Sequence, residues 1–178
     1  MKKINVIIFS ICAFIFSSCG NGGSGQQAQE EKQVIVLPEA AIELQDQTME
    51  DVLMQYLKVK NALTAAEASN AKTAADDLSN QLQDIEGCEE AARLANEIAQ
   101  SDSLQAQREK FSILSDDLIA LMKNADIKSG TIFVQYCPMA NEGNGAYWMA
   151  SQKDIRNPYY GEDMLECGEV KEELKSEN

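Results

Sequence analysis

Apolar residues recur at the spacing of an amphipathic α-helix in four successive segments of the chain. Residues three or four positions apart lie on the same face of a helix, so each segment presents one apolar stripe. The stripes run over residues 49–63, 71–85, 91–98 and 104–122. An antiparallel bundle with short connections buries each stripe against a neighbouring helix. The pattern therefore predicts a four-helix antiparallel bundle.

Residues with helix-ending or helix-starting tendencies lie at the borders of these segments. Thr48 is the predicted N-cap of the first helix, with Asp51 at its third position. Gly87 is a typical C-terminal residue for the second helix. The capping side chains of residues 101–103 mark a break before the fourth helix. These signals separate the stripes into distinct helices.

Beyond Lys128 the helical pattern ends, and glycine, proline and aromatic residues become frequent. Residues 131–136 are mostly β-branched and aromatic, which favours a strand. Residues 146–150 can pair with them across a Gly- and Asn-rich turn at 141–145, forming a hairpin. A lone hairpin is marginally stable in water, so we expect it to pack on the bundle. The predicted fold class is mainly α, with a small C-terminal β-hairpin and irregular turns.

The first residues have the pattern of an export signal. Two lysines follow Met1, and residues 4–16 form an apolar run that is too short to span a bilayer as a helix. Small residues precede Cys19, which resembles the lipobox of bacterial lipoproteins, where the signal is removed and the cysteine is acylated. We therefore expect lipidation at Cys19 and a periplasm-facing location in the cell envelope; a plain secretory signal is the alternative. Gly20 is not acidic, which under lipoprotein sorting rules favours the outer membrane.

These patterns divide the chain into four parts. Residues 1–18 are the predicted lipoprotein signal peptide, and residues 19–47 are the lipidated anchor and a flexible tether rich in Gly, Ser and Gln. Residues 48–171 form the predicted helical-bundle domain, which ends in a segment rich in Cys and Met. Residues 172–178 are a charged tail, and we expect the chain to fray from Glu169 onward.

Composition excludes several classes of function. The 178 residues include 0 histidines, which excludes a Ser-His-Asp or Cys-His nucleophilic site and an H-E-x-x-H zinc site. The formal net charge is −14, from 15 Lys and Arg against 29 Asp and Glu, and it repels phosphate backbones. We therefore expect neither an enzyme nor a nucleic-acid partner.

Sulfur-bearing side chains gather near the C-terminal end. Of the 5 cysteines, Cys12 and Cys19 belong to the signal and anchor, which leaves Cys88 and two others in the folded body. Thiolate and thioether sulfur select Cu(I) or Ag(I) over hard cations. We therefore hypothesise a Cu(I) or Ag(I) site with three main ligands, Cys137, Met139 and Cys167, and two auxiliary ligands, Met149 and Met164.

The same residues allow a purely structural interpretation. Cys137 and Cys167 can form a disulfide in an oxidising periplasm, which on the chain-entropy model stabilises by about 3–4 kcal/mol. A disulfide and a thiolate metal site exclude each other for the same two sulfur atoms. Methionines commonly fill cores, and Trp148 can pack the hairpin. The alternative function is a non-catalytic structural or interaction module with a Cys137–Cys167 disulfide.

Other residues have predicted structural roles. Arg108 lies among apolar residues on the fourth helix, so it can anchor a carboxylate or the carbonyls of the C-terminal turns; a snorkelling side chain is the alternative. Asn157, Pro158 and Gly161 are typical turn residues and predict a second turn after the hairpin.

Five ordered segments carry a resemblance to a known family. They are R-E-K-F-S-I-L-S from Arg108, Q-Y-C-P-M-A from Gln135, G-A-Y-W-M-A from Gly145, I-R-N-P-Y-Y-G from Ile155 and M-L-E-C-G-E-V from Met164. In this order they are similar to the domain of unknown function 3347 family. The resemblance covers about residues 49–171.

The resemblance has implications for partners and ligands. Members of this family occur as envelope lipoproteins and as C-terminal extensions of periplasmic adaptors of heavy-metal efflux systems. This implies copper or silver handling, with an efflux adaptor or another envelope protein as partner. The family's Cys-Pro-Met and Met-Leu-x-Cys-Gly elements correspond to residues 137–139 and 164–168. A Leu-Ser pair commonly follows the family's tryptophan, whereas this chain has Met149 and Ala150. The family has no established activity.

Overall fold

The structure is a computed structural model that describes residues 37–176. The predicted signal peptide, the predicted lipidation site Cys19 and most of the predicted tether lie outside these residues. Within the described range, no helix has both the length and the apolar character needed to cross a membrane.

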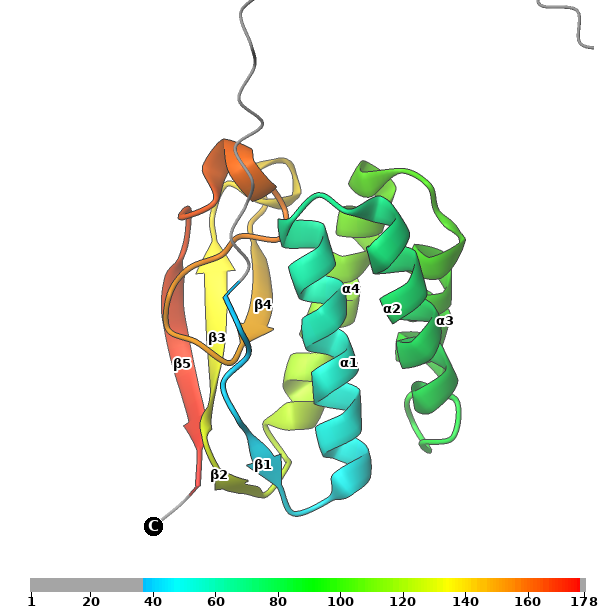
Figure 1. Cartoon of the computed structure of the whole chain (residues 1–178), viewed down its shortest axis with the longest axis vertical. Coiled ribbons are helices and arrows are strands. Elements are labelled where there is room, and N and C mark those ends of the chain that lie inside the picture. Colours follow the sequence, from blue (N-terminus) through cyan, green and yellow to red (C-terminus); the bar gives the residue numbers. More distant parts are fainter. Residues whose placement is uncertain (1–36, 177–178) are drawn as a thin grey trace, which may run out of the picture. The chain divides into compact units, whose positions relative to one another are not determined.

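Four helices form an antiparallel bundle, which confirms the predicted fold class (Figure 1). They are α1 (Gln47–Thr64), α2 (Ala68–Leu82), α3 (Glu89–Gln100) and α4 (Leu104–Met122). Each helix buries its apolar stripe, and the most buried side chains include Leu53, Leu78, Ile98 and Leu118. The bundle is therefore held by burial of one face of each helix, as its hydrophobic spacing predicted.

The helix caps agree with the predictions in part. Ser103 caps α4, because its side chain accepts a hydrogen bond from the Ala106 backbone N–H at 3.3 Å. The prediction for α1 was wrong: Asp46 is the N-cap, and its carboxylate accepts from the Thr48 N–H at 2.8 Å. The Asp46 carboxylate, two residues earlier, satisfies one of the free N–H groups of the first turn, so Thr48 is already helical.

The C-terminal region forms a three-stranded antiparallel sheet with the strand order β4-β3-β5. Strands β3 (Thr131–Cys137) and β4 (Ala146–Ala150) form the predicted hairpin. The predicted fraying from Glu169 was wrong, because β5 (Glu169–Lys175) pairs with the other edge of β3. Pairing satisfies backbone groups that β3 would otherwise leave free.

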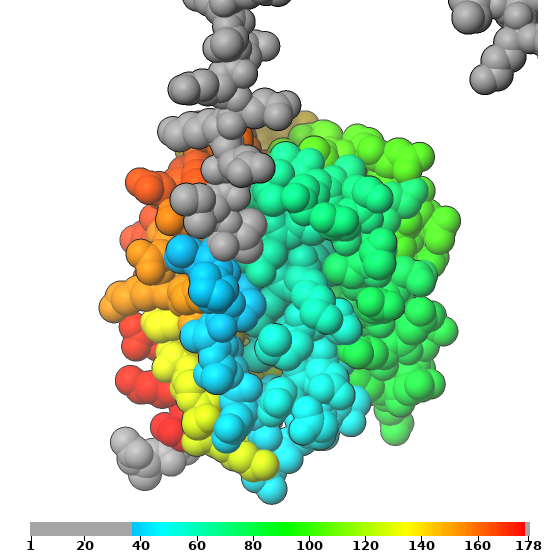
Figure 2. All heavy atoms as spheres, in the orientation of Figure 1, coloured from blue at the N-terminus to red at the C-terminus, as the bar shows by residue number. Residues whose placement is uncertain are grey.

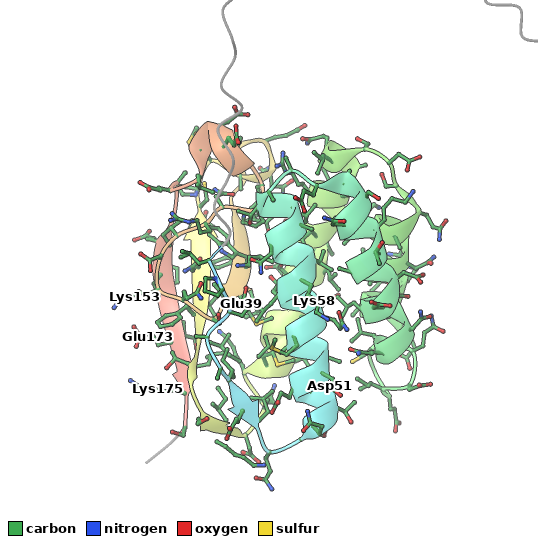
Figure 3. All side chains as sticks on the ribbon, viewed as in Figure 1. Glu39, Asp51, Lys58, Lys153, Glu173 and Lys175 are labelled. Carbon is green, nitrogen blue, oxygen red and sulfur yellow. The ribbon has the colours of Figure 1, made fainter. Side chains whose placement is uncertain are left out.

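The outer edge of β5 carries charged side chains (Figure 3). Glu173 lies between two lysines, with its carboxylate 3.4 Å from Lys153 Nζ and 4.0 Å from Lys175 Nζ. Strand β5 also has an irregular register opposite Val134 and Gln135. Charges and bulges are the usual means by which an edge strand avoids pairing with another chain.

Residues 37–46 belong to the folded body, although the sequence suggested a tether up to residue 47. Strand β1 (Glu43–Leu44) pairs with β2 (Ile127–Ser129), and Ile42 and Leu44 are buried. Figure 2 shows this segment packed in the seam between α1 and the sheet. The folded body therefore begins before the predicted boundary at residue 48.

Glu39 fixes this N-terminal segment to the body. Its carboxylate accepts a hydrogen bond from Asn61 Nδ2 at 2.6 Å and another from the Ser151 hydroxyl. It also pairs with Lys60 Nζ at 3.5 Å, and the Lys60 side chain is only 5% exposed. Glu39 lies beside α1 in Figure 3. The segment thus supplies the counter-ion for a lysine buried on α1.

Two tyrosine hydroxyls join the outer edge of β4 to the rest of the protein. Tyr56 of α1 accepts a hydrogen bond from the Met149 backbone N–H at 3.1 Å and also bonds to Ser115 of α4 at 2.8 Å. Tyr159 donates to the Tyr147 carbonyl at 2.6 Å. Side-chain hydroxyls therefore replace the neighbouring strand that this edge lacks, and the helices and sheet share one core.

Candidate functional site: the thiol pair Cys137 and Cys167

The fold brings Cys137 and Cys167 together from positions 30 residues apart, with their Sγ atoms separated by 2.7 Å. Cys137 is the last residue of β3 and is fully buried, whereas Cys167 is partly exposed just before β5. Both are thiols, and a disulfide bond would place the sulfur atoms about 2.05 Å apart. The two sulfur atoms are thus in direct contact without a covalent bond.

The hydrogen bond between the Cys167 thiol and the Cys137 sulfur, together with partial burial, raises the pKa of Cys167 to about 11. Both causes favour the neutral thiol over the thiolate. The thiolate is the form that attacks electrophiles and binds metals. At neutral pH Cys167 is therefore a weak nucleophile, and metal binding by its sulfur requires loss of a proton.

Asn157 positions the segment that carries Cys167. Its Nδ2 donates to the Cys167 carbonyl at 2.8 Å, and its backbone N–H donates to the Leu165 carbonyl at 2.8 Å. Its Oδ1 accepts from the Tyr159 N–H at 2.8 Å, and its carbonyl accepts from the Gly161 N–H at 3.1 Å. One fully buried side chain thus joins the predicted second turn to the thiol pair.

Arg108 holds the same turn against the helices. Its Nε donates to the Pro158 carbonyl at 2.9 Å, and its Nη2 donates to the Leu63 carbonyl at 3.0 Å. Gly161 lies so close that a Cβ atom there would be 3.1 Å from Arg108 Nη2 and 3.0 Å from the Thr64 carbonyl oxygen. Carbonyl groups, rather than a carboxylate, are therefore the partners of this guanidinium.

Trp148 packs over the backbone next to Cys167. It is fully buried and lies edge-on to Tyr159, with 5.9 Å between the ring centroids. A Cβ atom on Gly168 would lie 2.8 Å from the far edge of the indole and 3.0 Å from the Tyr136 carbonyl oxygen. The sequence marked Gly168 only as part of a resemblance, because nothing local shows that a tryptophan twenty residues earlier packs on it.

Of the three methionines, Met149 lies on the face of the sheet opposite to that of Cys137. In the β3–β4 register Cys137 faces Ala146 and Val134 faces Met149, so Met149 projects from the opposite face of the sheet. This register corrects the hypothesis that Met149 is an auxiliary ligand. Met139 is 54% exposed while Cys137 is fully buried. Met164 is partly exposed in the 3₁₀-helix η2 (Gly161–Met164), and its carbonyl accepts from the Cys167 N–H at 3.0 Å.

A cluster of the usual metal-binding residues is not found in the described part of the chain. Between residues 37 and 176, no three His, Cys, Asp or Glu side chains are grouped so that they could hold a metal ion. The third thiol of the body, Cys88, is buried at the N-cap of α3, and burial raises its pKa. The thiol pair is therefore the candidate site.

The fold and site define a four-helix bundle that carries a three-stranded sheet with two contacting thiols at its end. The model of the family described as Protein of unknown function (DUF3347) matches residues 52–130. The matched residues run from α1 to the residue before β3, and the match confirms the resemblance to this family over that part of the chain. The match includes the motif at Arg108, while the four other motifs lie beyond it. No curated protein and no solved structure matches the chain.

Proposed function

We propose that this protein is a non-catalytic, lipid-anchored module of the cell envelope, whose C-terminal sheet is closed by a Cys137–Cys167 disulfide. The 2.7 Å contact between the two sulfur atoms carries this proposal. Disulfides persist in the oxidising envelope, the compartment that the lipobox-like segment before Cys19 indicates. Membrane attachment through Cys19 follows from the lipobox-like segment, and docking to an efflux adaptor or another envelope protein follows from the family resemblance; both belong to this proposal.

Closing the bond requires little movement of the two chains that carry it. The two thiols give up two protons and two electrons to an external disulfide oxidant, which leaves as a dithiol. The bond joins the end of β3 to the segment before β5. On the chain-entropy model a loop of this length stabilises the protein by about 3–4 kcal/mol.

We expect the protein isolated from the envelope without reductant to contain one free thiol, that of Cys88, and three after reduction. Thiol titration of the denatured protein, with intact mass, measures this directly. Reduction should also lower the free energy of unfolding by about 3–4 kcal/mol. Cys137→Ser should abolish the effect of reductant on stability, whereas Cys88→Ser should preserve it. Three free thiols in the unreduced protein would contradict the disulfide.

Cu(I) or Ag(I) binding is the second candidate for the same pair. Two thiol sulfurs in contact, with Met139 exposed on the adjacent turn, supply soft ligands for a monovalent ion. The raised pKa of Cys167 means that the ion competes with a proton for this sulfur. Affinity should therefore increase as the pH rises.

We expect the reduced protein to bind one Cu(I) ion, and the oxidised protein to bind none at this pair. Competition with a coloured Cu(I) chelator measures the affinity. Cys137→Ser and Cys167→Ser should each abolish binding, while Met149→Leu should leave it unchanged because Met149 projects from the other face of the sheet. If the reduced protein fails to bind Cu(I), the metal-binding candidate is wrong and the disulfide proposal is unaffected.

A further inference from the structure

A cavity of about 220 Å³ lies away from the thiol pair, between the first turns of α4 and the turns at residues 141–142 and 159–160. In Figure 1 this is the end of the molecule where η2 and the connection after β3 approach the N-terminal end of α4. Sites for drug-sized molecules measure about 300–1,000 Å³, so this cavity fits only a smaller compound.

Arg108 supplies a cation to this cavity. Two of its five N–H groups donate to the Pro158 and Leu63 carbonyls, which fixes the guanidinium and leaves the others available. Among residues 37–176 no carboxylate forms an ion pair with it. Asp163 is near enough to raise its pKa, yet burial dominates and lowers it. A half-buried guanidinium without a counter-ion favours an incoming carboxylate, which it can bind through two parallel hydrogen bonds.

Two carboxylates line the same cavity. Glu109 comes from α4, and Glu142 comes from the turn after β3. Asn141 and Glu142 both have positive φ angles, 50° and 57°, which are uncommon for residues other than glycine. This backbone conformation brings Glu142 to the cavity at a cost of about 1–3 kcal/mol per residue. Because the acids outnumber the arginine, a simple anion is repelled, and a ligand that also carries a positive charge is favoured.

Tyr160 completes the wall with a fixed ring. Its hydroxyl donates a hydrogen bond to the Met139 carbonyl at 2.5 Å, so the side chain is held on the turn that follows Cys137. Apolar ring surface next to a guanidinium and two carboxylates suits a short organic molecule with charges at one end. The sequence had marked Arg108 and the turn at residues 157–161 as structural, and the proposed disulfide does not use this cavity.

We propose that this cavity binds a free α-amino acid, with the ligand carboxylate on Arg108 and its ammonium group between Glu109 and Glu142. The side chain of the amino acid lies against Tyr160, and the small volume selects short side chains. This inference does not rest on the proposed function, because neither thiol contributes to the cavity.

Titration of the full mature protein with L-alanine, followed by NMR or calorimetry, tests this proposal. Acetate and methylammonium each reproduce one charge of the amino acid, so each should bind at least about tenfold more weakly than alanine. Glu142→Gln should weaken alanine binding about tenfold while leaving acetate binding unchanged or stronger. Glu86→Gln, an exposed substitution in the α2–α3 connection with the same charge change, is the matched control.

Arg108→Lys keeps the positive charge but loses the planar fork, and it should also weaken alanine binding. Because Arg108 holds two carbonyls, circular dichroism must show that this variant is folded; Glu142→Gln decides the question if it is not. The proposal is overturned if alanine fails to bind at about 50 mM, a concentration above the range of specific ligands. It is also overturned if acetate binds as tightly as alanine, or if Glu142→Gln behaves like Glu86→Gln.

Discussion

Replacing Glu39 by glutamine is expected to lower the free energy of unfolding by about 3–5 kcal/mol, the usual cost of removing one partner of a buried ion pair. The substitution leaves Lys60 without its counter-ion, with its side chain only 5% exposed. It also weakens the attachment of residues 37–44, which hold Glu39 against α1. Urea unfolding followed by circular dichroism measures the loss, and limited proteolysis should show earlier cleavage within this segment.

The double variant Glu39→Gln, Lys60→Met provides the control. It removes the buried charge together with its partner, so most of the lost stability should return, since apolar replacement of a whole buried pair is often neutral. If the double variant is less stable than Glu39→Gln alone, the cation at Lys60 is not the cause of the loss.

The stability loss of the single variant Glu39→Gln should depend on pH. Burial is the main cause that lowers the pKa of Lys60 below its ordinary value of 10.5, and Glu39 partly offsets it. At a pH where Lys60 is protonated in both the folded and the unfolded state, its lowered pKa reduces the free energy of unfolding. This cost disappears as the pH rises through the pKa of the folded state toward 10.5, because the folded protein then holds a neutral amine. The loss in Glu39→Gln should therefore shrink at alkaline pH, and a loss independent of pH would contradict this account.

The second large effect is expected at Gly168, where substitution by alanine should lower the free energy of unfolding by about 2–5 kcal/mol. Gly168 has a φ of +148°, and its added Cβ would lie 2.8 Å from the Trp148 ring and 3.0 Å from a backbone oxygen. The ring is fully buried and the oxygen belongs to β3, so neither can move freely. Thermal or urea unfolding measures the change.

Gly87→Ala is the matched control for Gly168→Ala. Gly87 also has a positive φ, +85°, but a Cβ there meets no atom within 4 Å. Gly87→Ala should therefore lower the free energy of unfolding by only about 1–2 kcal/mol, the conformational cost of a side chain at positive φ. The difference between the two variants measures the contact with Trp148, and equal losses would show that this contact is unimportant. Because Gly168 follows Cys167, Gly168→Ala should also slow disulfide formation.

The helices and the hairpin were predictable because their signals are local. A helix that packs on one side needs apolar residues three or four positions apart, and a hairpin needs two strand-like segments beside a turn. Strand β5 was missed because Val170 and Leu174 are its only half-buried apolar residues among charged ones. Its partner is the free edge of β3, which a local pattern does not reveal.

The candidate site was predictable in part. Soft-ligand chemistry pointed to Cys137 and Cys167, and these two sulfur atoms are in contact. It also pointed to Met149, which the strand register places on the opposite face of the sheet. Sequence spacing alone cannot show which of these sulfur atoms lie together. The turns between β4 and β5 decide which side chains lie next to the end of β3.

The amino-acid sequence by itself determined the four helices, the hairpin, the absence of imidazole chemistry and the choice of Cys137 and Cys167 as candidate partners. Only the tertiary structure decided that residues 37–46 close the body, that Glu39 neutralises Lys60 and that tyrosine hydroxyls complete the edge of β4. The physical reason is range: periodicity and turn chemistry act between near neighbours, whereas buried charges and free backbone groups find partners far along the chain.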